Sequence, residues 1–180
     1  LALRGGEHSH GTAGGGAEDG VIEPLAVVRV DLLGVVESRE RPDAIDRMIA
    51  DNAGVIGAAR TPADARRLNR EGKLVAFKSI ENSYPLGDDL SLLKEFYDKG
   101  VRLAGPVHGS NNQFADSATD NPRWNGLSPL GKQWVAEMTR LGIVIDASHS
   151  SDATFDQLLA LSKYPILLSH SSLRSAHDHP

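Results

Sequence analysis

Two segments of the chain end alike, Gly142-Ile-Val-Ile-Asp-Ala-Ser-His149 and Tyr164-Pro-Ile-Leu-Leu-Ser-His170. Each is a short apolar run that closes on Ser-His, and residues 151–163 between them have the pattern of a helix. This order predicts a strand–helix–strand unit in which a histidine follows each of two parallel strands. In barrels and doubly wound sheets the carboxyl ends of such strands carry the chemistry, so two imidazoles at this edge indicate a metal site.

The same alternation extends toward the N-terminus and predicts a parallel sheet with helical crossovers. We expect an α/β fold and a TIM (β/α)8 barrel, here an incomplete barrel of about five strands, since a whole barrel usually needs about 250 residues. An open sheet is the alternative, but no glycine-rich nucleotide-binding motif follows any predicted strand. The predicted strands cover residues 27–36, 73–80, 101–107, 143–147 and 166–169, and the predicted helices cover residues 42–52, 62–72, 90–99, 128–142 and 151–163.

Two parts of the chain differ in composition. Residues 1–20 are rich in glycine and are predicted to form a flexible leader, whereas residues 21–180 are predicted to form a partial barrel, the catalytic domain. The chain has no initiator Met and stops at Pro180 in a polar stretch. We therefore expect the barrel to be truncated at its C-terminal end and at its N-terminal end as well.

Charge and hydropathy exclude several classes of partner. The net charge is −5 and no long basic run is present, so neither nucleic acid nor an anionic membrane is an expected partner. No apolar run approaches the roughly 18 residues of a transmembrane segment. No signal peptide is evident, which favours a soluble, cytoplasmic protein without fixing the compartment. The sequence has no cysteine, so a metal would be held by histidine and carboxylate.

Four predicted strands end in a group that can bind a metal or transfer a proton: Glu81, His108, His149 and His170. In a parallel barrel these side chains meet at one mouth. Two imidazoles and one carboxylate, Glu81, His149 and His170, form the ligand set of many catalytic zinc sites, whose fourth position stays open for water. His108 is then free to donate a hydrogen bond to a developing oxyanion.

Plainer interpretations compete with a metal site. A single histidine at a strand end more often caps the backbone than binds a metal, and only the combination on successive strands favours a ligand set. His8 and His10 can bind metal adventitiously, but solvated leader residues are the favoured interpretation. Trp124 and Trp134 are predicted to pack. Asp146 is predicted either to bond the neighbouring backbone or to orient His149.

The sequence around these residues resembles one family, the membrane dipeptidase (renal dipeptidase) family of zinc metallopeptidases. The likeness runs from about Asp43 to Pro180 and is specific, because several separate motifs occur in a family-like order. They are Glu71-Gly-Lys-Leu-Val-Ala-Phe77, Ile80-Glu-Asn82, residues 90–102, Gly126-Leu-Ser-Pro-Leu-Gly-Lys132, residues 140–155, residues 165–175 and His177-Asp-His-Pro180.

The resemblance implies a barrel of the metal-dependent-hydrolase type with two zinc ions, which hydrolyses dipeptides by a metal-bridging hydroxide. Glu81 would bridge both metals, His149 and His170 would complete the second metal, and His108 would bind the scissile carbonyl of the substrate. The partner would be a small-molecule dipeptide. A homodimer is a candidate assembly of the full-length parent.

The chain also departs from the family. The His-x-Asp pair of the family's first strand is not found, and the late aspartate and the substrate-binding arginine would follow Pro180. No catalytic residue is therefore assigned, and the fragment is expected to be inactive alone. Pro106 and Lys78 are unusual within predicted central strands. Two alternatives stay open: another amidohydrolase-type metal hydrolase, such as a deaminase or lactonase, or a non-catalytic, degenerate homologue that acts as a scaffold.

Overall fold

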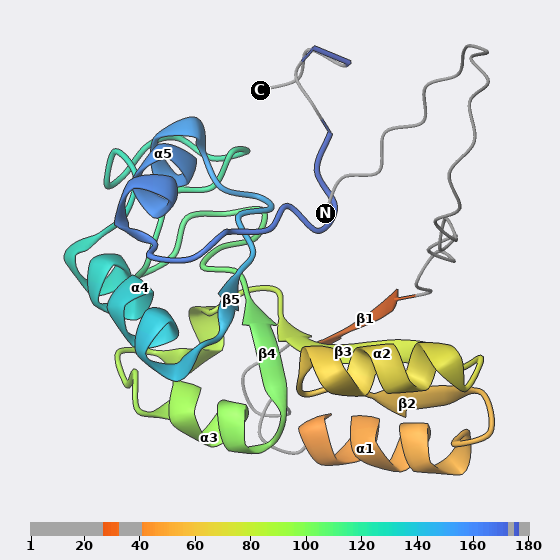
Figure 1. Cartoon of the computed structure of the whole chain (residues 1–180). Helices are drawn as coiled ribbons and strands as arrows, with labels where there is room; N and C mark the ends of the chain where they lie inside the picture. The colour runs from red at the N-terminus through yellow and green to blue at the C-terminus, as the bar shows by residue number, and fades with distance from the viewer. Residues whose placement is uncertain (1–26, 33–40, 173–174, 177–180) are drawn as a thin grey trace, which may run out of the picture.

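Strands and helices alternate along the described part of the chain, which comprises residues 27–32, 41–172 and 175–176 of a computed structural model (Figure 1). The predicted leader and residues 33–36 of the first predicted strand lie outside this part. The elements, in chain order, are β1 (Val27–Leu32), α1 (Arg41–Asp51), β2 (Ile56–Ala58), α2 (Pro62–Arg70), β3 (Leu74–Ile80), the short 3-10 helix η1 (Tyr84–Leu86), α3 (Leu92–Asp98), β4 (Val101–Ala104), α4 (Pro129–Leu141), β5 (Val144–Ile145) and α5 (Asp152–Leu161).

The sheet is parallel throughout and is centred on β3. Strand β1 pairs with the stretch Val75–Ile80 of β3, β2 pairs with Leu74–Ala76, and β4 pairs with the last residues of β3, from Lys78 to Ile80. Because a strand has only two edges and β1 overlaps both other partners, β2 and β4 share the edge opposite β1. Strand β5 extends the sheet beyond β4. The predicted parallel α/β architecture, a partial barrel, is confirmed.

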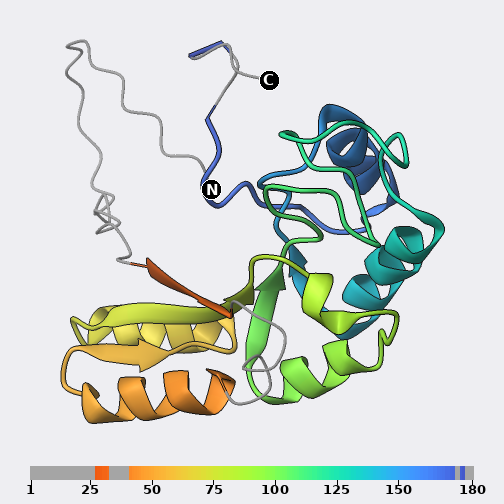
Figure 2. The same ribbon diagram turned by 180° about the vertical axis from the view of Figure 1, so that it is seen from behind.

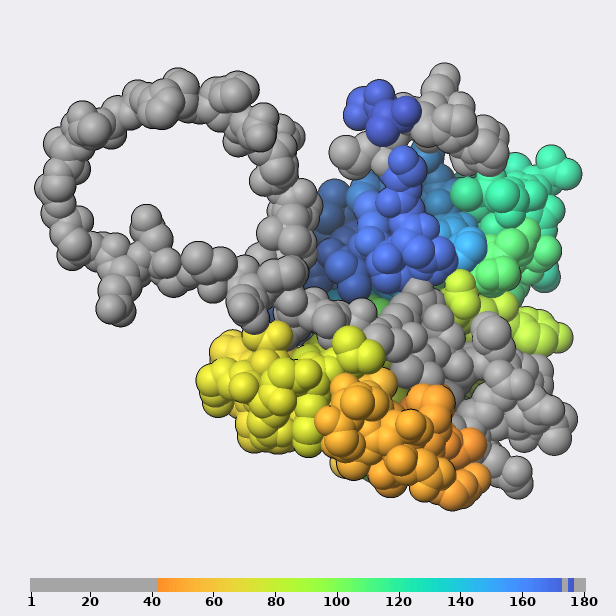
Figure 3. All heavy atoms as spheres, turned by 90° about the vertical axis from the view of Figure 1, so that its right-hand side faces the viewer, coloured from red at the N-terminus to blue at the C-terminus, as the bar shows by residue number. Residues whose placement is uncertain are grey.

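Helices cover both faces of this sheet (Figures 1 and 2). Val75 and Ala76 are neighbours on β3 and therefore point to opposite faces. Val75 packs against Ala65 and Leu68 of α2 in a small cluster. Ala76 belongs to the main core, which includes residues of α1, α3, α4 and α5. Helix α2 thus lies on the face opposite the main core, and α1 and α2 both lie at the same end of the molecule (Figure 3).

Local signals fix where the helices begin and end. Thr61 caps α2 in a reciprocal capping box with Asp64, and Pro62 occupies the first turn. The Ser128 hydroxyl accepts from the backbone N–H of Gly131 at the start of α4. Gly142 ends that helix in the left-handed region, with a φ of 73°. These boundaries agree with the predicted ones.

The structure corrects three details of the predicted strands. Strand β2 was not predicted and separates two helices that the sequence places in succession. The strand predicted at residues 166–169 is reduced to one parallel bridge between Asp146 and Leu167. On one side of the bridge Pro165 has no N–H with which to extend the ladder, and on the other side the Ser169 N–H donates to the Asp146 carboxylate instead. Strand β4 ends at Ala104, so Pro106 lies beyond the ladder and removes none of its hydrogen bonds.

Lys78 has a structural explanation. Its side chain is 2% exposed, and its Nζ lies 2.8 Å from both carboxylate oxygens of Asp46 on α1. The ion pair joins the sheet to the helix and partners a charge that would otherwise be costly to bury. Among the described helices, none has the length and apolar character needed to cross a membrane.

Candidate metal centre

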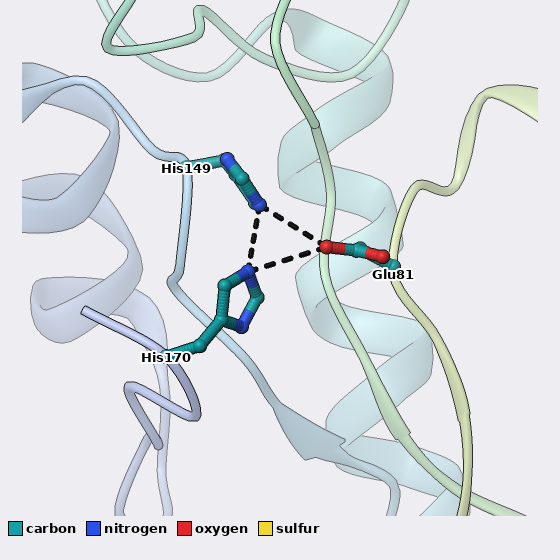
Figure 4. A group of neighbouring side chains, drawn as sticks. All are labelled: Glu81, His149 and His170. Atoms are coloured by element: carbon teal, nitrogen blue, oxygen red, sulfur yellow. Dashed lines mark hydrogen bonds and ion pairs between the residues drawn. The ribbon is translucent and has the colours of Figure 1, made fainter. Parts of the chain in front are cut away.

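Three of the predicted site residues meet at the carboxyl ends of the strands. Glu81 directly follows β3, His149 lies in the turn after β5, and His170 follows the bridge at Leu167. Glu81 Oε1 lies 3.1 Å from His149 Nε2 and 3.2 Å from His170 Nε2, and the two Nε2 atoms are 2.7 Å apart. The three side chains point at one another from separate segments of the chain (Figure 4).

This donor set fits a metal ion. Two imidazole nitrogens and a carboxylate oxygen lie within 4.8 Å of one another. Tetrahedral zinc with bonds of about 2.0–2.1 Å sets its ligand atoms roughly 3.3 Å apart. The two distances to Glu81 are close to that value, and only the two imidazole nitrogens, 2.7 Å apart, must separate, by about 0.6 Å. Three protein ligands leave one position for water or substrate, as in catalytic zinc sites.

His149 reaches the cluster from an unusual backbone conformation. Its φ is 68°, in the left-handed region that few residues with a side chain adopt. A turn bond from Ser150 N–H to the Ala147 carbonyl and a bond from Ala118 N–H to the His149 carbonyl hold this conformation. Strained backbone of this kind often occurs at functional sites.

The environment of His149 favours its neutral form. Burial lowers the pKa of His149, and the neighbouring His108 and His170 lower it further, whereas the hydrogen bond to Glu81 acts in the opposite direction. The net result is a pKa below the ordinary value of histidine. A neutral imidazole is the form that binds a metal.

His170 is tied to a buried carboxylate through a serine that the sequence did not single out. Ser169 Oγ donates to Asp146 Oδ2 and lies 2.7 Å from His170 Nδ1. Asp146 Oδ1 accepts from the backbone N–H groups of Ser148 and Ser169. Of the two predicted roles of Asp146, bonding to the neighbouring backbone is therefore found. The Asp146 side chain is also linked through Ser169 to His170.

The pKa of Asp146 reflects these bonds. Burial raises the pKa of this carboxyl, but the hydrogen bonds from Ser169 and Ser148 together outweigh burial and hold the pKa below its usual range. Asp146 is thus an ionised carboxylate that accepts hydrogen bonds and donates none. The repeated Ser-His ending contains Ser169, but the sequence does not indicate its role, because that role depends on the distance between β5 and the segment bridged at Leu167.

His108 lies on the open side of the same cluster. Its Nε2 is 3.6 Å from Glu81 Oε1, its ring centroid is 4.2 Å from that of His149, and its side chain is 49% exposed. The Ser117 hydroxyl donates to the His108 carbonyl at 2.6 Å. The loop beyond is held by the buried Asp116, whose carboxylate accepts from the backbone N–H groups of Trp124 and Gly126.

A polar recess of about 280 Å³ opens beside His108. It gives the cluster a neighbouring space large enough for small polar groups and lined by side-chain amides. The lining residues are Asn82, Tyr84, His108, Gly109, Ser110, Asn111 and Asn112.

Comparison with known proteins places these features in a family. The model of the membrane dipeptidase family, peptidase family M19, matches residues 31–180. The chain belongs to the membrane dipeptidase family. An uncharacterized dipeptidase of Schizosaccharomyces pombe is 45% identical over 102 residues, 56% of this chain and 25% of that protein. Dipeptidase verJ of Clonostachys rogersoniana is 35% identical over 139 residues, 77% of this chain and 36% of that protein.

Two solved structures share the fold of this chain. The probable dipeptidase PvdM of Pseudomonas aeruginosa superposes with a TM-score of 0.78 at 37% identity, over 84% of this chain and 44% of that one. An amidohydrolase of the same organism gives a TM-score of 0.80 at 25% identity, over 86% of this chain and 48% of that one. The chain thus spans between about a quarter and a half of the relatives that it matches.

Proposed function

We propose that this chain is the part of a zinc-dependent dipeptidase that carries one metal half-site, with Glu81, His149 and His170 as ligands. The observation that carries the proposal is the convergence of these three ligand atoms within 4.8 Å in a member of the membrane dipeptidase family. A zinc ion bound there supplies Lewis acidity, which activates water and polarises a peptide carbonyl.

The protein groups have distinct parts in this proposal. Glu81 is the least exposed of the cluster, with 15% of its side chain accessible, and is suited to hold a cation. His108 is the most exposed and is suited to donate a hydrogen bond from Nε2 to the oxygen of the attacked carbonyl. Water adds to the carbonyl carbon, the C–N bond breaks, and a proton from water leaves on the new amine.

Zinc titration of the 180-residue chain tests the half-site. We expect one equivalent of tight binding, lost in Glu81→Gln and in His170→Gln and retained in His108→Gln. His8→Gln/His10→Gln is the matched control. His8 and His10 are a closely spaced pair of histidines outside the cluster, as are His177 and His179. If the leader variant abolishes binding while the cluster variants retain it, the half-site is wrong.

Substrate class needs a second measurement, made on the parent protein that contains this chain. We expect hydrolysis of a panel of dipeptides, and inhibition by a phosphinate mimic of a dipeptide, the type of ligand bound to a related metallo peptidase of Rhodobacter sphaeroides. The structural relative described as an amidohydrolase favours one competing function, hydrolysis of a different amide or ester. Turnover of lactones without turnover of any dipeptide supports that competitor.

A further inference from the structure

The hydrogen bonds around Asp146 determine where the proton of Ser169 lies. Asp146 is buried at the end of β5, with 2% of its surface exposed. Its Oδ1 is occupied by two backbone donors, at 3.1 Å from Ser148 N and 3.2 Å from Ser169 N. Its Oδ2 faces the Ser169 hydroxyl. Because a carboxylate only accepts, the single proton of the Ser169 hydroxyl points at Asp146.

The same geometry determines the proton of His170. The one proton of Ser169 Oγ lies in the hydrogen bond to Asp146. This oxygen, 2.7 Å from His170 Nδ1, can therefore only accept a hydrogen bond from that nitrogen. Nδ1 must then carry the N–H. A neutral imidazole has one N–H, and Nε2 is therefore left with its lone pair. Nε2 is the atom that faces Glu81 and His149.

We propose that Asp146 and Ser169 are positioning residues that select the Nδ1–H tautomer of His170 and so present Nε2 as a metal ligand. The tautomer follows from the hydrogen bonds of the chain itself, and its value for metal binding rests on the proposed function. Partners that fix a ligating imidazole in this way commonly change metal affinity by about 10–100-fold when they are removed.

Asp146→Asn is the decisive substitution because it reverses the chain of hydrogen bonds. The amide oxygen can keep the two backbone donors, while the amide nitrogen replaces Oδ2 and donates to Ser169 Oγ. The Ser169 hydroxyl then turns its proton toward His170 Nδ1, and the imidazole proton moves to Nε2. We expect Zn²⁺ affinity to fall by about 10–100-fold.

The double variant separates this account from a loss of structure. Ser169→Ala removes the relay and no longer selects a tautomer of His170, so it should weaken Zn²⁺ binding toward the lower end of that range, less than Asp146→Asn, which selects the wrong tautomer. In Asp146→Asn/Ser169→Ala no hydroxyl transmits the wrong proton, so affinity should return to the level of Ser169→Ala. A double variant that binds as weakly as Asp146→Asn, or more weakly, overturns the proposal.

Imidazole nitrogen chemical shifts give a readout without metal. In the metal-free chain at a pH where His170 is neutral, we expect the Nδ1–H form in the wild type and the Nε2–H form in Asp146→Asn. If Asp146→Asn does not fold, Ser169→Thr, which keeps the hydroxyl, should retain the preference for the Nδ1–H form that Ser169→Ala weakens. An Nε2–H imidazole in the wild type overturns the proposal. If the chemical shifts are as expected but the chain binds no Zn²⁺, the hydrogen-bond relay from Asp146 to His170 is supported and the proposed function is rejected.

Discussion

His149 combines two unusual properties at the scale of a single residue, a left-handed backbone and a lowered pKa. Its folded-state pKa lies below the unfolded value of about 6.5, so below that value the unfolded chain binds more protons than the folded chain. The contribution of His149 to stability is therefore complete above about pH 6.5 and is lost as the pH falls through the lowered pKa.

We accordingly expect the urea midpoint of the metal-free chain to decrease as the pH falls below about 6.5. His149→Asn should make this decrease shallower, because asparagine tolerates a positive φ and does not titrate. Urea titrations at several pH values check both statements. An identical pH dependence in the wild type and the variant contradicts this role of His149.

At the scale of elements, α2 depends on its first turn. Helix α2 is short, contributes only Ala65 and Leu68 to the small cluster on Val75, and starts from the capping box of Thr61 and Asp64. Thr61→Ala removes the acceptor for the backbone N–H of Asp64 and should cost about 1 kcal/mol of unfolding free energy. Thr61→Ser keeps the acceptor and should stay near the wild type in urea unfolding. Equal losses in both variants would assign the effect to the lost methyl group.

The elements also show what the sequence can predict. Helices α1 to α5 and strands β3 and β4 follow from period, caps and glycines, so they were predicted within a few residues. Strand β2 has only three residues, and the Leu68 side chain packs directly over its Gly57, a tertiary contact without a local signal. Likewise, the strand-end rule predicted that Glu81, His108, His149 and His170 would meet, whereas Ser169 depends on the spacing between β5 and the bridged segment.

At the scale of the whole molecule, the face of the sheet that carries α2 is apolar and exposed where α2 does not cover it. A groove of about 480 Å³ lies along it, lined by residues of β3, β4, β5 and the segment near His170. Val144 and Leu168 in this groove are each 43% exposed. Open apolar surface of this kind promotes association in solution.

Val144→Thr should therefore reduce self-association and binding of a hydrophobic dye, while changing the unfolding free energy by only about 0.5 kcal/mol. Leu158→Ala is the matched control, because Leu158 is fully buried in the main core and its truncation should cost about 2–5 kcal/mol. Light scattering and dye fluorescence at equal protein concentration measure the first effect. Unchanged association in Val144→Thr would mean that another surface is responsible.

The wide spacing of the ligand cluster along the chain has a kinetic consequence. His149 is 68 positions from Glu81 and 21 from His170, so the three atoms meet only after distant segments have docked. Contacts of such long sequence separation form late, because the closing of long loops is entropically unfavourable. An ion held by all three would act as a reversible cross-link that delays unfolding much more than it speeds folding. The half-site would therefore lengthen the lifetime of the folded chain.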